Sequence, residues 1–198
     1  QWPVQCHEAK AAVRYLRAKA SELGLDPSNI IAAGMSAGGH MACMLGVTAE
    51  HDELNGALGE YAEQSNEVQG VLALYPPTDF LAVPKRFDGL LDYYAEDSPV
   101  TQLLGETIEA APHKSDLASP LKLLNNSGST PACPPALLLH GNADPIVPVE
   151  QSELMHASMK SLGLDSELVL IEGYTHGDYR FNRDEPAQRI HQFLERLL

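Results

Sequence analysis

Short apolar runs alternate with amphipathic segments along most of this chain, and this alternation limits the folds open to it. Four runs are predicted to be buried strands because they are short, apolar and bounded by Gly or Pro: residues 29–34, 68–75, 136–140 and 167–171. Apolar residues at helical spacing predict helices over residues 7–23, 149–162 and 184–198, with one more opening near Gly38. Strands joined by crossover helices form a parallel sheet covered on both faces, so we predict one α/β domain over residues 1–198.

One long segment, residues 78–130, interrupts this alternation between the second and third predicted strands. It is rich in Asp, Pro, Ser and Asn, and roughly fifty residues is too long for a plain connection. We therefore expect a cap or lid-like insertion. Five aromatic residues could line a pocket beneath this insertion: Tyr75, which precedes it, and Phe80, Phe87, Tyr93 and Tyr94 within it. The alternative is that most of them only pack the insertion itself.

The composition excludes several classes of partner. The 198 residues carry 13 Lys and Arg against 27 Asp and Glu, a net charge of −14 that repels nucleic acid and anionic lipid. No apolar run approaches the roughly 18 residues of a membrane span. The three cysteines lie far apart, and no histidine pair has metal-ligand spacing with a third partner, so neither a disulfide scaffold nor a metal site is predicted. A soluble protein follows, with cytoplasmic and secreted locations both left open.

Residues 34–38 fit the pattern G-x-S-x-G, with Ser36 at the centre, between a predicted strand and a predicted helix. In such a turn the glycines two before and two after the serine prevent collisions between strand and helix, and the serine projects above the sheet. Ser36 is therefore a candidate nucleophile. The alternative is a glycine-rich turn without chemistry or one that holds a phosphate, although the chain lacks the Lys-Ser/Thr pair typical of a phosphate loop.

A serine hydroxyl needs a base to take its proton, and that base needs a carboxylate to hold it. Asp144 follows the third predicted strand and His176 follows the fourth, and sites in parallel sheets form at this edge. Two alternatives stay open: His176 as an ordinary loop histidine, and Asp144 as a turn residue. The carboxylates competing with Asp144 are Asp79, Asp165 and Asp178. Among the other histidines, His40 and His140 are expected to be structural, and the rest solvated: His7, His51, His113, His156 and His191.

Several motifs resemble the carboxylesterase branch of the α/β-hydrolases, whose triad runs in the chain order Ser, Asp, His. They are Ser36-Ala37-Gly38-Gly39-His40-Met41-Ala42, the helix 11–17 with its Gly24-Leu25-Asp26-Pro27 turn, and residues 140–152. Within that branch the chain is most similar to the BD-FAE-like esterases and lipases, akin to the hormone-sensitive-lipase type. The resemblance implies an α/β-hydrolase fold with Ser36 as nucleophile, His176 as base and Asp144 as acid. It also implies the backbone N–H of Ala37 as an oxyanion-hole donor, and no cofactor.

The chain departs from this family in one respect. Its members carry further amino-terminal strands and a His-Gly-Gly-Gly-like loop that completes the oxyanion hole, and nothing of that kind precedes Ser36. The resemblance thus implies the carboxyl-terminal portion of a longer esterase, truncated at its amino-terminal side. The first strand would expose an apolar edge, which a homo-oligomer or a missing amino-terminal segment would cover. We expect the isolated chain to turn over more slowly than its intact parent, because losing one oxyanion donor slows catalysis by roughly 10²–10³-fold.

The predicted activity is hydrolysis of short-chain carboxylic esters through an acyl-enzyme, with acetyl or feruloyl esters of polysaccharide as candidate substrates. A serine peptidase of the prolyl-oligopeptidase type is the first alternative, although those enzymes usually carry an aromatic residue where this chain has Ala37. The second alternative is a catalytically weak or non-catalytic binder with the same fold.

Overall fold

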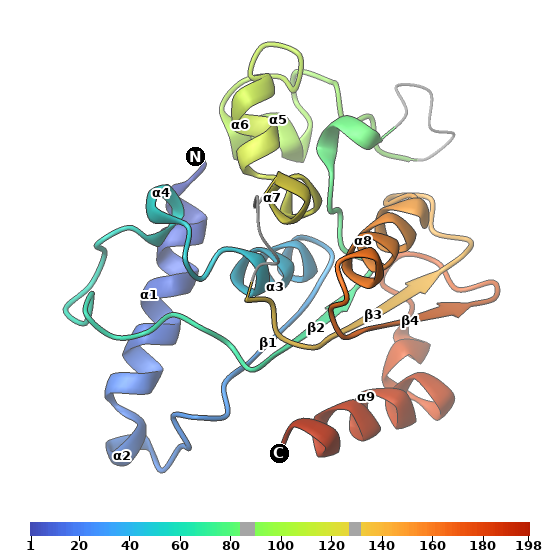
Figure 1. Ribbon diagram of the computed structural model, residues 1–198. Coiled ribbons are helices and arrows are strands. Elements are labelled where there is room, and N and C mark those ends of the chain that lie inside the picture. The colour runs from blue at the N-terminus through green and yellow to red at the C-terminus, as the bar shows by residue number, and fades with distance from the viewer. Residues whose placement is uncertain (84–89, 127–131) are drawn as a thin grey trace.

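A computed structural model describes residues 1–83, 90–126 and 132–198 of the chain. Its centre is a parallel sheet whose four described strands lie in chain order, which confirms the predicted fold class (Figure 1). The strands are β1 (Ile31–Met35), β2 (Gly70–Leu74), β3 (Ala136–Gly141) and β4 (Ser166–Ile171). Every residue of β2 and β3 is buried, as expected of strands covered on both faces.

Helices cover the two faces of the sheet unequally. On one face lie α1 (Val4–Ala18), α3 (Ala37–Val47) and α8 (Glu150–Ser161), while α9 (Asp184–Leu197) crosses the other face (Figure 1). The first face packs Ala73 and Leu138 against Cys43 of α3 and Met159 of α8. Alternate residues of the same strands, such as Leu72, Leu137 and Leu139, point the other way and pack against Phe193 of α9. The period of two in the strands thus divides the core into two layers.

The amino-terminal helix is shorter than predicted. The sequence indicated one helix over residues 7–23, but α1 ends at Ala18 and a separate turn, α2 (Ala20–Leu23), follows. Gly24 ends this turn with a left-handed φ of 68°, a conformation that glycine adopts without strain. A short α4 (Asp52–Asn55), which the sequence pattern did not indicate, lies against α1.

The described part of segment 78–130 folds into short helices above α3 and α8 (Figure 1). They are the 3-10 turn η1 (Phe80–Ala82), α5 (Pro99–Leu104), α6 (Pro112–Leu117) and α7 (Pro120–Asn126); a second 3-10 turn, η2 (Tyr179–Asn182), precedes α9. Phe80, Tyr93 and Leu104 form a separate apolar cluster with Trp2 and Met44. Phe87, one of the aromatic residues singled out in the sequence, lies outside the described residues.

The strand β1 lies at the side of the sheet and pairs only with β2 among the described strands. Its residue Met35 is 55% exposed.

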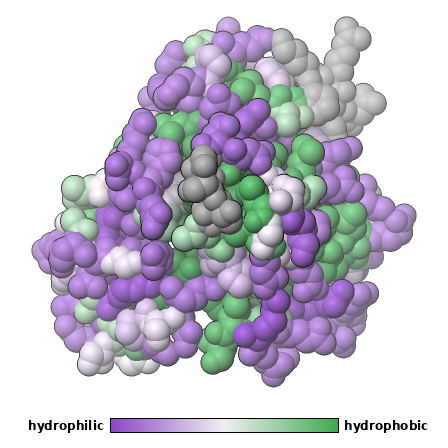
Figure 2. Space-filling model, viewed as in Figure 1, coloured by the Kyte–Doolittle hydropathy of each residue, from purple (hydrophilic) through white to green (hydrophobic). Residues whose placement is uncertain are grey.

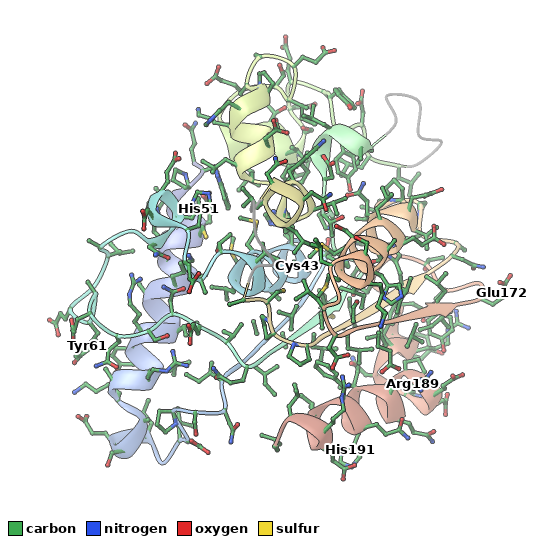
Figure 3. All side chains as sticks on the ribbon, viewed as in Figure 1. Cys43, His51, Tyr61, Glu172, Arg189 and His191 are labelled. Atoms are coloured by element: carbon green, nitrogen blue, oxygen red, sulfur yellow. The ribbon has the colours of Figure 1, made fainter. Side chains whose placement is uncertain are left out.

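The face of the molecule seen in Figure 2 is mainly hydrophilic, with hydrophobic residues in small groups, one of them near the carboxyl end of the chain. Cys43, on α3, lies in the interior, whereas Glu172, Arg189 and His191 lie at the periphery (Figure 3). No helix in the described ranges is long and apolar enough to cross a bilayer.

Candidate active site

The turn between β1 and α3 holds Ser36 in a backbone conformation that is rare for a residue with a side chain. Its φ is 53° and its ψ is −120°, and its N–H donates to the carbonyl oxygen of Leu74 on the neighbouring strand at 2.9 Å. A Cβ on Gly34 would lie 2.3 Å from the backbone of Gly38, so only glycine fits at position 34. Strained conformations of this kind concentrate at functional sites, where the surrounding structure holds them in place.

The second glycine of the motif has a different role from the one predicted. A Cβ on Gly38 would meet no atom within 4 Å, so Gly38 avoids no collision through its own side-chain position. The close approach on this side is made by Gly39, whose Cβ would lie 3.0 Å from the carbonyl oxygen of Leu74. The pentapeptide pattern therefore identifies the turn, but the position after the serine at which close packing requires glycine is 39 rather than 38.

Asp144 lies in the turn that follows β3, where backbone amides fix its carboxylate. Its Oδ1 accepts hydrogen bonds from the N–H groups of Ile146 at 2.8 Å and Val147 at 2.9 Å. The side chain is only 1% exposed. These bonds explain why an aspartate stands here, since a short carboxylate can accept from backbone groups two and three residues ahead.

His176 reaches the site from the loop after β4. Gly173 and Gly177, on either side of it, have left-handed φ values of 72° and 69°, which lets the loop turn back over the sheet edge. The ring of Tyr75, at the end of β2, meets the His176 imidazole edge to face, with 4.6 Å between centroids. Tyr75 has a φ of 41°, so a second strained residue supports the base.

The three predicted side chains form one continuous hydrogen-bonded chain. The Ser36 hydroxyl donates to His176 Nε2 at 2.9 Å, and His176 Nδ1–H donates to Asp144 Oδ2 at 2.8 Å. Burial alone would raise the pKa of Asp144, but hydrogen bonds from His140, His176, Val147 and Ile146 outweigh it and hold that pKa well below its usual range. Asp144 is thus an anion at neutral pH, able to orient the imidazole and to stabilise its cation.

The competing carboxylates are engaged elsewhere. Asp178 forms a two-point ion pair with Arg180, and Asp165 pairs with Arg196 on α9. The third competitor, Asp79, caps η1 through the N–H groups of Leu81 and Ala82. The structure therefore brings Asp144 to His176, while the three competing carboxylates pair with arginines or cap a helical turn.

The first turn of α3 begins at Ala37, directly after the serine. The opening N–H groups of a helix have no partner within it, and the helix dipole places partial positive charge there. Ala37 is exposed and lines the cavity next to Ser36. Its N–H can therefore donate to an oxygen that develops negative charge beside the serine.

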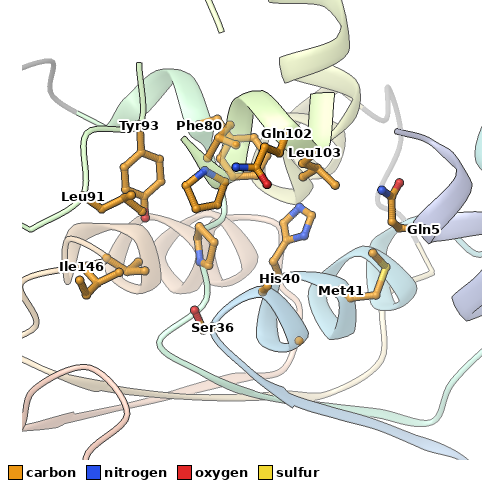
Figure 4. Close-up of a pocket in the computed structure, with 16 residues that line it drawn as sticks. Gln5, Ser36, His40, Met41, Phe80, Leu91, Tyr93, Gln102, Leu103 and Ile146 are labelled. Atoms are coloured by element: carbon orange, nitrogen blue, oxygen red, sulfur yellow. The ribbon is translucent and has the colours of Figure 1, made fainter. Parts of the chain in front are cut away.

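A largely apolar cavity of about 680 Å³ opens above Ser36. Figure 4 shows Leu91, Tyr93 and Ile146 on one side of the serine, and Met41 and Gln5 on the other. The roof comes from the described part of segment 78–130: Phe80, Leu91, Tyr93, Pro99, Val100, Gln102 and Leu103. No Lys, Arg, Asp or Glu is among the described residues that line the cavity.

Two residues near the site were not identified as partners of the catalytic candidates in the sequence. His140 was expected to be structural and is fully buried, but its Nε2 also lies 3.4 Å from Asp144 Oδ2. Tyr75 was expected to line the pocket or pack the insertion, and instead its ring contacts the His176 imidazole. Only the proximity of His140 to Asp144 in the sequence, four residues apart, signalled either contact. Within the described ranges, no three His, Cys, Asp or Glu side chains converge as metal ligands.

Comparisons with known proteins place these features in context. The BD-FAE family model matches residues 1–159 of the chain. The esterase LipC of Mycobacterium tuberculosis is 30% identical over 154 residues, which are 77% of this chain and 35% of LipC. The matched residues of the chain span 32% to 38% of the length of these curated relatives.

Two solved structures show the same architecture. A truncated form of a carbohydrate esterase from gut microbiota is 26% identical and superposes with a TM-score of 0.85, covering 99% of this chain and 69% of that one. Esterase 2 of Thermogutta terrifontis with butyrate bound is 27% identical, with a TM-score of 0.67 over 96% of this chain and 62% of the other.

Proposed function

The chain belongs to the BD-FAE family, and from this premise we propose that it is a serine carboxylesterase acting on short-chain carboxylic esters through an acyl-enzyme. The observation that carries the proposal is the hydrogen-bonded chain from Ser36 through His176 to Asp144 at the floor of an apolar cavity. That LipC is named an esterase adds support.

In the proposed reaction Ser36 Oγ attacks the carbonyl carbon of the ester while its proton passes to His176 Nε2. The carbonyl oxygen becomes an oxyanion beside the N–H of Ala37. The bond to the alcohol then breaks, His176 gives its proton to the departing oxygen, and the acyl group stays on Ser36. Water, deprotonated by His176, then attacks the acyl-enzyme, the bond between the acyl carbon and Ser36 Oγ breaks, and His176 returns the proton to Oγ as the carboxylic acid leaves. Asp144 stays ionised throughout and holds the imidazole in position.

The cavity favours an apolar group of a few carbons on the substrate. Its walls are mainly aliphatic and aromatic, so burying an apolar group against them is favourable. The same walls offer no counter-charge to an ionised group. The butyrate held by the esterase of Thermogutta terrifontis is a group of this kind. The similarity to a carbohydrate esterase supports a carbohydrate as the natural carrier of the ester. The proposed bond is an acetyl or feruloyl ester of a polysaccharide.

The test is hydrolysis of p-nitrophenyl acetate and p-nitrophenyl butyrate by the wild-type chain and by Ser36→Ala. We expect ester turnover that falls by at least about 10³-fold in the variant, since the nucleophile is lost. Turnover that survives in Ser36→Ala would contradict the proposal. Cleavage of a proline p-nitroanilide without cleavage of the esters would instead favour a peptidase of the prolyl-oligopeptidase type.

A further inference from the structure

His140, the penultimate residue of β3, uses both ring nitrogens inside the protein. Its side chain is fully buried, Nε2 lies 3.1 Å from the carbonyl oxygen of Val147, and Nδ1 lies 2.7 Å from Ser152 Oγ on α8. A carbonyl oxygen only accepts, so Nε2 must carry a proton. In the neutral imidazole the Ser152 hydroxyl then donates to Nδ1, which fixes the tautomer.

The same Nε2–H faces the carboxylate of Asp144. It lies 3.4 Å from Oδ2, the oxygen that also accepts from His176 Nδ1 at 2.8 Å. The turn between His140 and Val147 therefore passes close to the His140 ring, with a carbonyl oxygen 3.1 Å and a carboxylate oxygen 3.4 Å from Nε2. Asp144 is held from two sides, by backbone amides on Oδ1 and by two imidazoles on Oδ2.

Helix α8 provides the fixed point for this arrangement. Ser152, in its first turn, is fully buried, and Gln151 beside it is 1% exposed. The Gln151 side chain accepts from the N–H groups of Thr78 at 2.7 Å and Asp79 at 2.8 Å, at the start of the insertion. One turn of α8 thus ties the segment carrying Asp144 to the segment that roofs the cavity.

We propose that His140 is a positioning residue for the reaction: with Ser152 behind it, its Nε2–H holds Asp144 Oδ2 where His176 needs it and takes up part of the carboxylate charge. This inference rests on the proposed function. A second donor on Oδ2 weakens the attraction between the carboxylate and the imidazolium that forms during the reaction, so its removal should move the acidic limb of the kcat/KM profile to higher pH.

Other titratable groups near Asp144 do not replace this donor. From β2, Tyr75 places its ring 6.4 Å from that of His140, and from the insertion Tyr93 contributes a phenol. Burial, and then the charge of Asp144, raises the pKa of both phenols, so both stay neutral in the working pH range. The groups that act on the Asp144 carboxylate as donors are therefore His140, His176 and the two backbone amides.

Two amide substitutions separate the two nitrogens of His140. In His140→Gln the side-chain amide reaches the position of Nε2 and can still donate to Val147 and Asp144, while the bond to Ser152 is lost. In His140→Asn the shorter amide reaches only the position of Nδ1, so it can still meet Ser152 but no longer donates to Asp144. Both variants lose the imidazole ring, but only His140→Asn loses the donor to Asp144. Comparing them therefore separates the effect of that donor from the effect of losing the ring.

We expect His140→Asn to lower kcat on p-nitrophenyl butyrate by up to about 10²-fold with KM within about twofold, as misplacement of a catalytic group does. The acidic limb of its kcat/KM profile moves to higher pH. His140→Gln keeps most of kcat and the wild-type limb. Equal loss in both variants with an unchanged pH profile, or no loss in His140→Asn, would overturn the proposal. Thermal unfolding of both variants shows that the folded protein is being compared.

A measurement without turnover separates this proposal from the proposed function. The proton between His176 Nδ1 and Asp144 gives a low-field ¹H NMR signal, assigned by its absence in Asp144→Asn. We expect the signal to persist in His140→Gln and to shift or broaden in His140→Asn. An unchanged signal in His140→Asn would overturn the positioning role even if the wild-type chain hydrolysed no ester, whereas absent ester turnover alone would count against the proposed function.

Discussion

The catalytic candidates and the cavity roof come from two parts of the chain that are built differently. Ser36, Asp144 and His176 each follow a strand of the parallel sheet, and each is fixed by hydrogen bonds to a neighbouring strand or turn. The roof comes from η1, from Leu91 and Tyr93, and from the six-residue helix α5. Its buried side chains pack with Trp2 and Met44 in a cluster separate from the sheet core. We therefore propose that the loops at the carboxyl ends of the strands set the reactive geometry, and that the insertion selects the substrate that fits above it.

This division predicts that changes at the sheet edge abolish the reaction, while changes in the insertion redirect it. The largest effect is expected for Asp144→Asn, which keeps the shape of the acid but offers no charge and favours the wrong histidine tautomer. We expect kcat/KM on p-nitrophenyl butyrate to fall by roughly 10⁴-fold. The matched control is Asp165→Asn at an exposed ion pair, which should leave the rate unchanged. A fall of less than tenfold in Asp144→Asn would remove Asp144 from the proposed triad.

The next effect tests the strained turn. In Gly34→Ala the new Cβ would sit 2.3 Å from the backbone of Gly38, so β1 and α3 must separate. We expect a loss of about 1–3 kcal/mol in the free energy of unfolding, measured by urea denaturation, together with loss of activity as Ser36 moves. In the control Gly38→Ala, where a Cβ meets no atom, we expect stability to be kept or to rise by up to about 1 kcal/mol. Equal stability of the two variants would contradict this account of the turn.

A smaller effect is expected in the insertion. Leu103 lines the cavity, and Leu103→Ala lengthens the space above the serine without touching the hydrogen-bonded chain. The ratio of kcat/KM for p-nitrophenyl hexanoate to that for the acetate should rise about tenfold, with little change on the acetate. Leu90→Ala, at a leucine that is 81% exposed in the same insertion, serves as control and should leave the ratio unchanged. A general loss of rate on all esters would mean that the insertion also positions the catalytic groups.

The smallest effect concerns stability away from the site. Lys10 on α1 is fully buried, where it donates to the carbonyl oxygen of Thr48 and to Asn55 Oδ1. Burial, and then the charge of Arg14, lowers the pKa of Lys10 to about 8. An unfolded lysine titrates near pH 10.4, so between about pH 8 and 10.4 residue 10 binds more protons in the unfolded chain than in the folded one, and its contribution to the free energy of unfolding rises with pH.

Urea denaturation across this pH range checks the prediction. The free energy of unfolding of the wild type minus that of Lys10→Met should rise over this range, because the other titrating groups, among them cysteines with raised pKa values, cancel in the difference. The same difference for substitution of the exposed Lys160 should stay flat, and Lys10→Met should leave ester turnover at pH 7 unchanged. An identical pH dependence in Lys10→Met and the wild type would show that Lys10 does not carry it.

The parts of the fold that follow a simple periodicity could be predicted from the sequence. The four strands lie within about two residues of the apolar runs, and α8 and α9 begin within about a residue or two of their apolar stripes. The short helices of the insertion could not be predicted, because each spans fewer than two turns and is set by local caps such as Ser98 and Gly105. The break between α1 and α2 also escaped prediction, since the apolar spacing continues through it.

For the site, the G-x-S-x-G motif, the strand ends and the family resemblance together predicted which three side chains would meet. The role of His140 was not predictable, since apolar burial is all that its place in β3 indicates, and its contacts depend on how the turn at Asp144 folds back. The need for Gly39 rather than Gly38 depends on an approach to Leu74, on a strand far away in sequence. The periodicity of apolar residues predicts helices and strands, whereas contacts between loops can be seen only in the three-dimensional structure.

The central claim is that Ser36 is a nucleophile activated by His176 and Asp144, and covalent labelling tests it most directly. The full chain is incubated with a fluorophosphonate, and the modified peptide is located by mass spectrometry at several pH values. The account predicts a single adduct on Ser36, formed much more slowly in His176→Ala and in Asp144→Asn. Labelling on another residue, or labelling of Ser36 at the same rate in both variants, would contradict it.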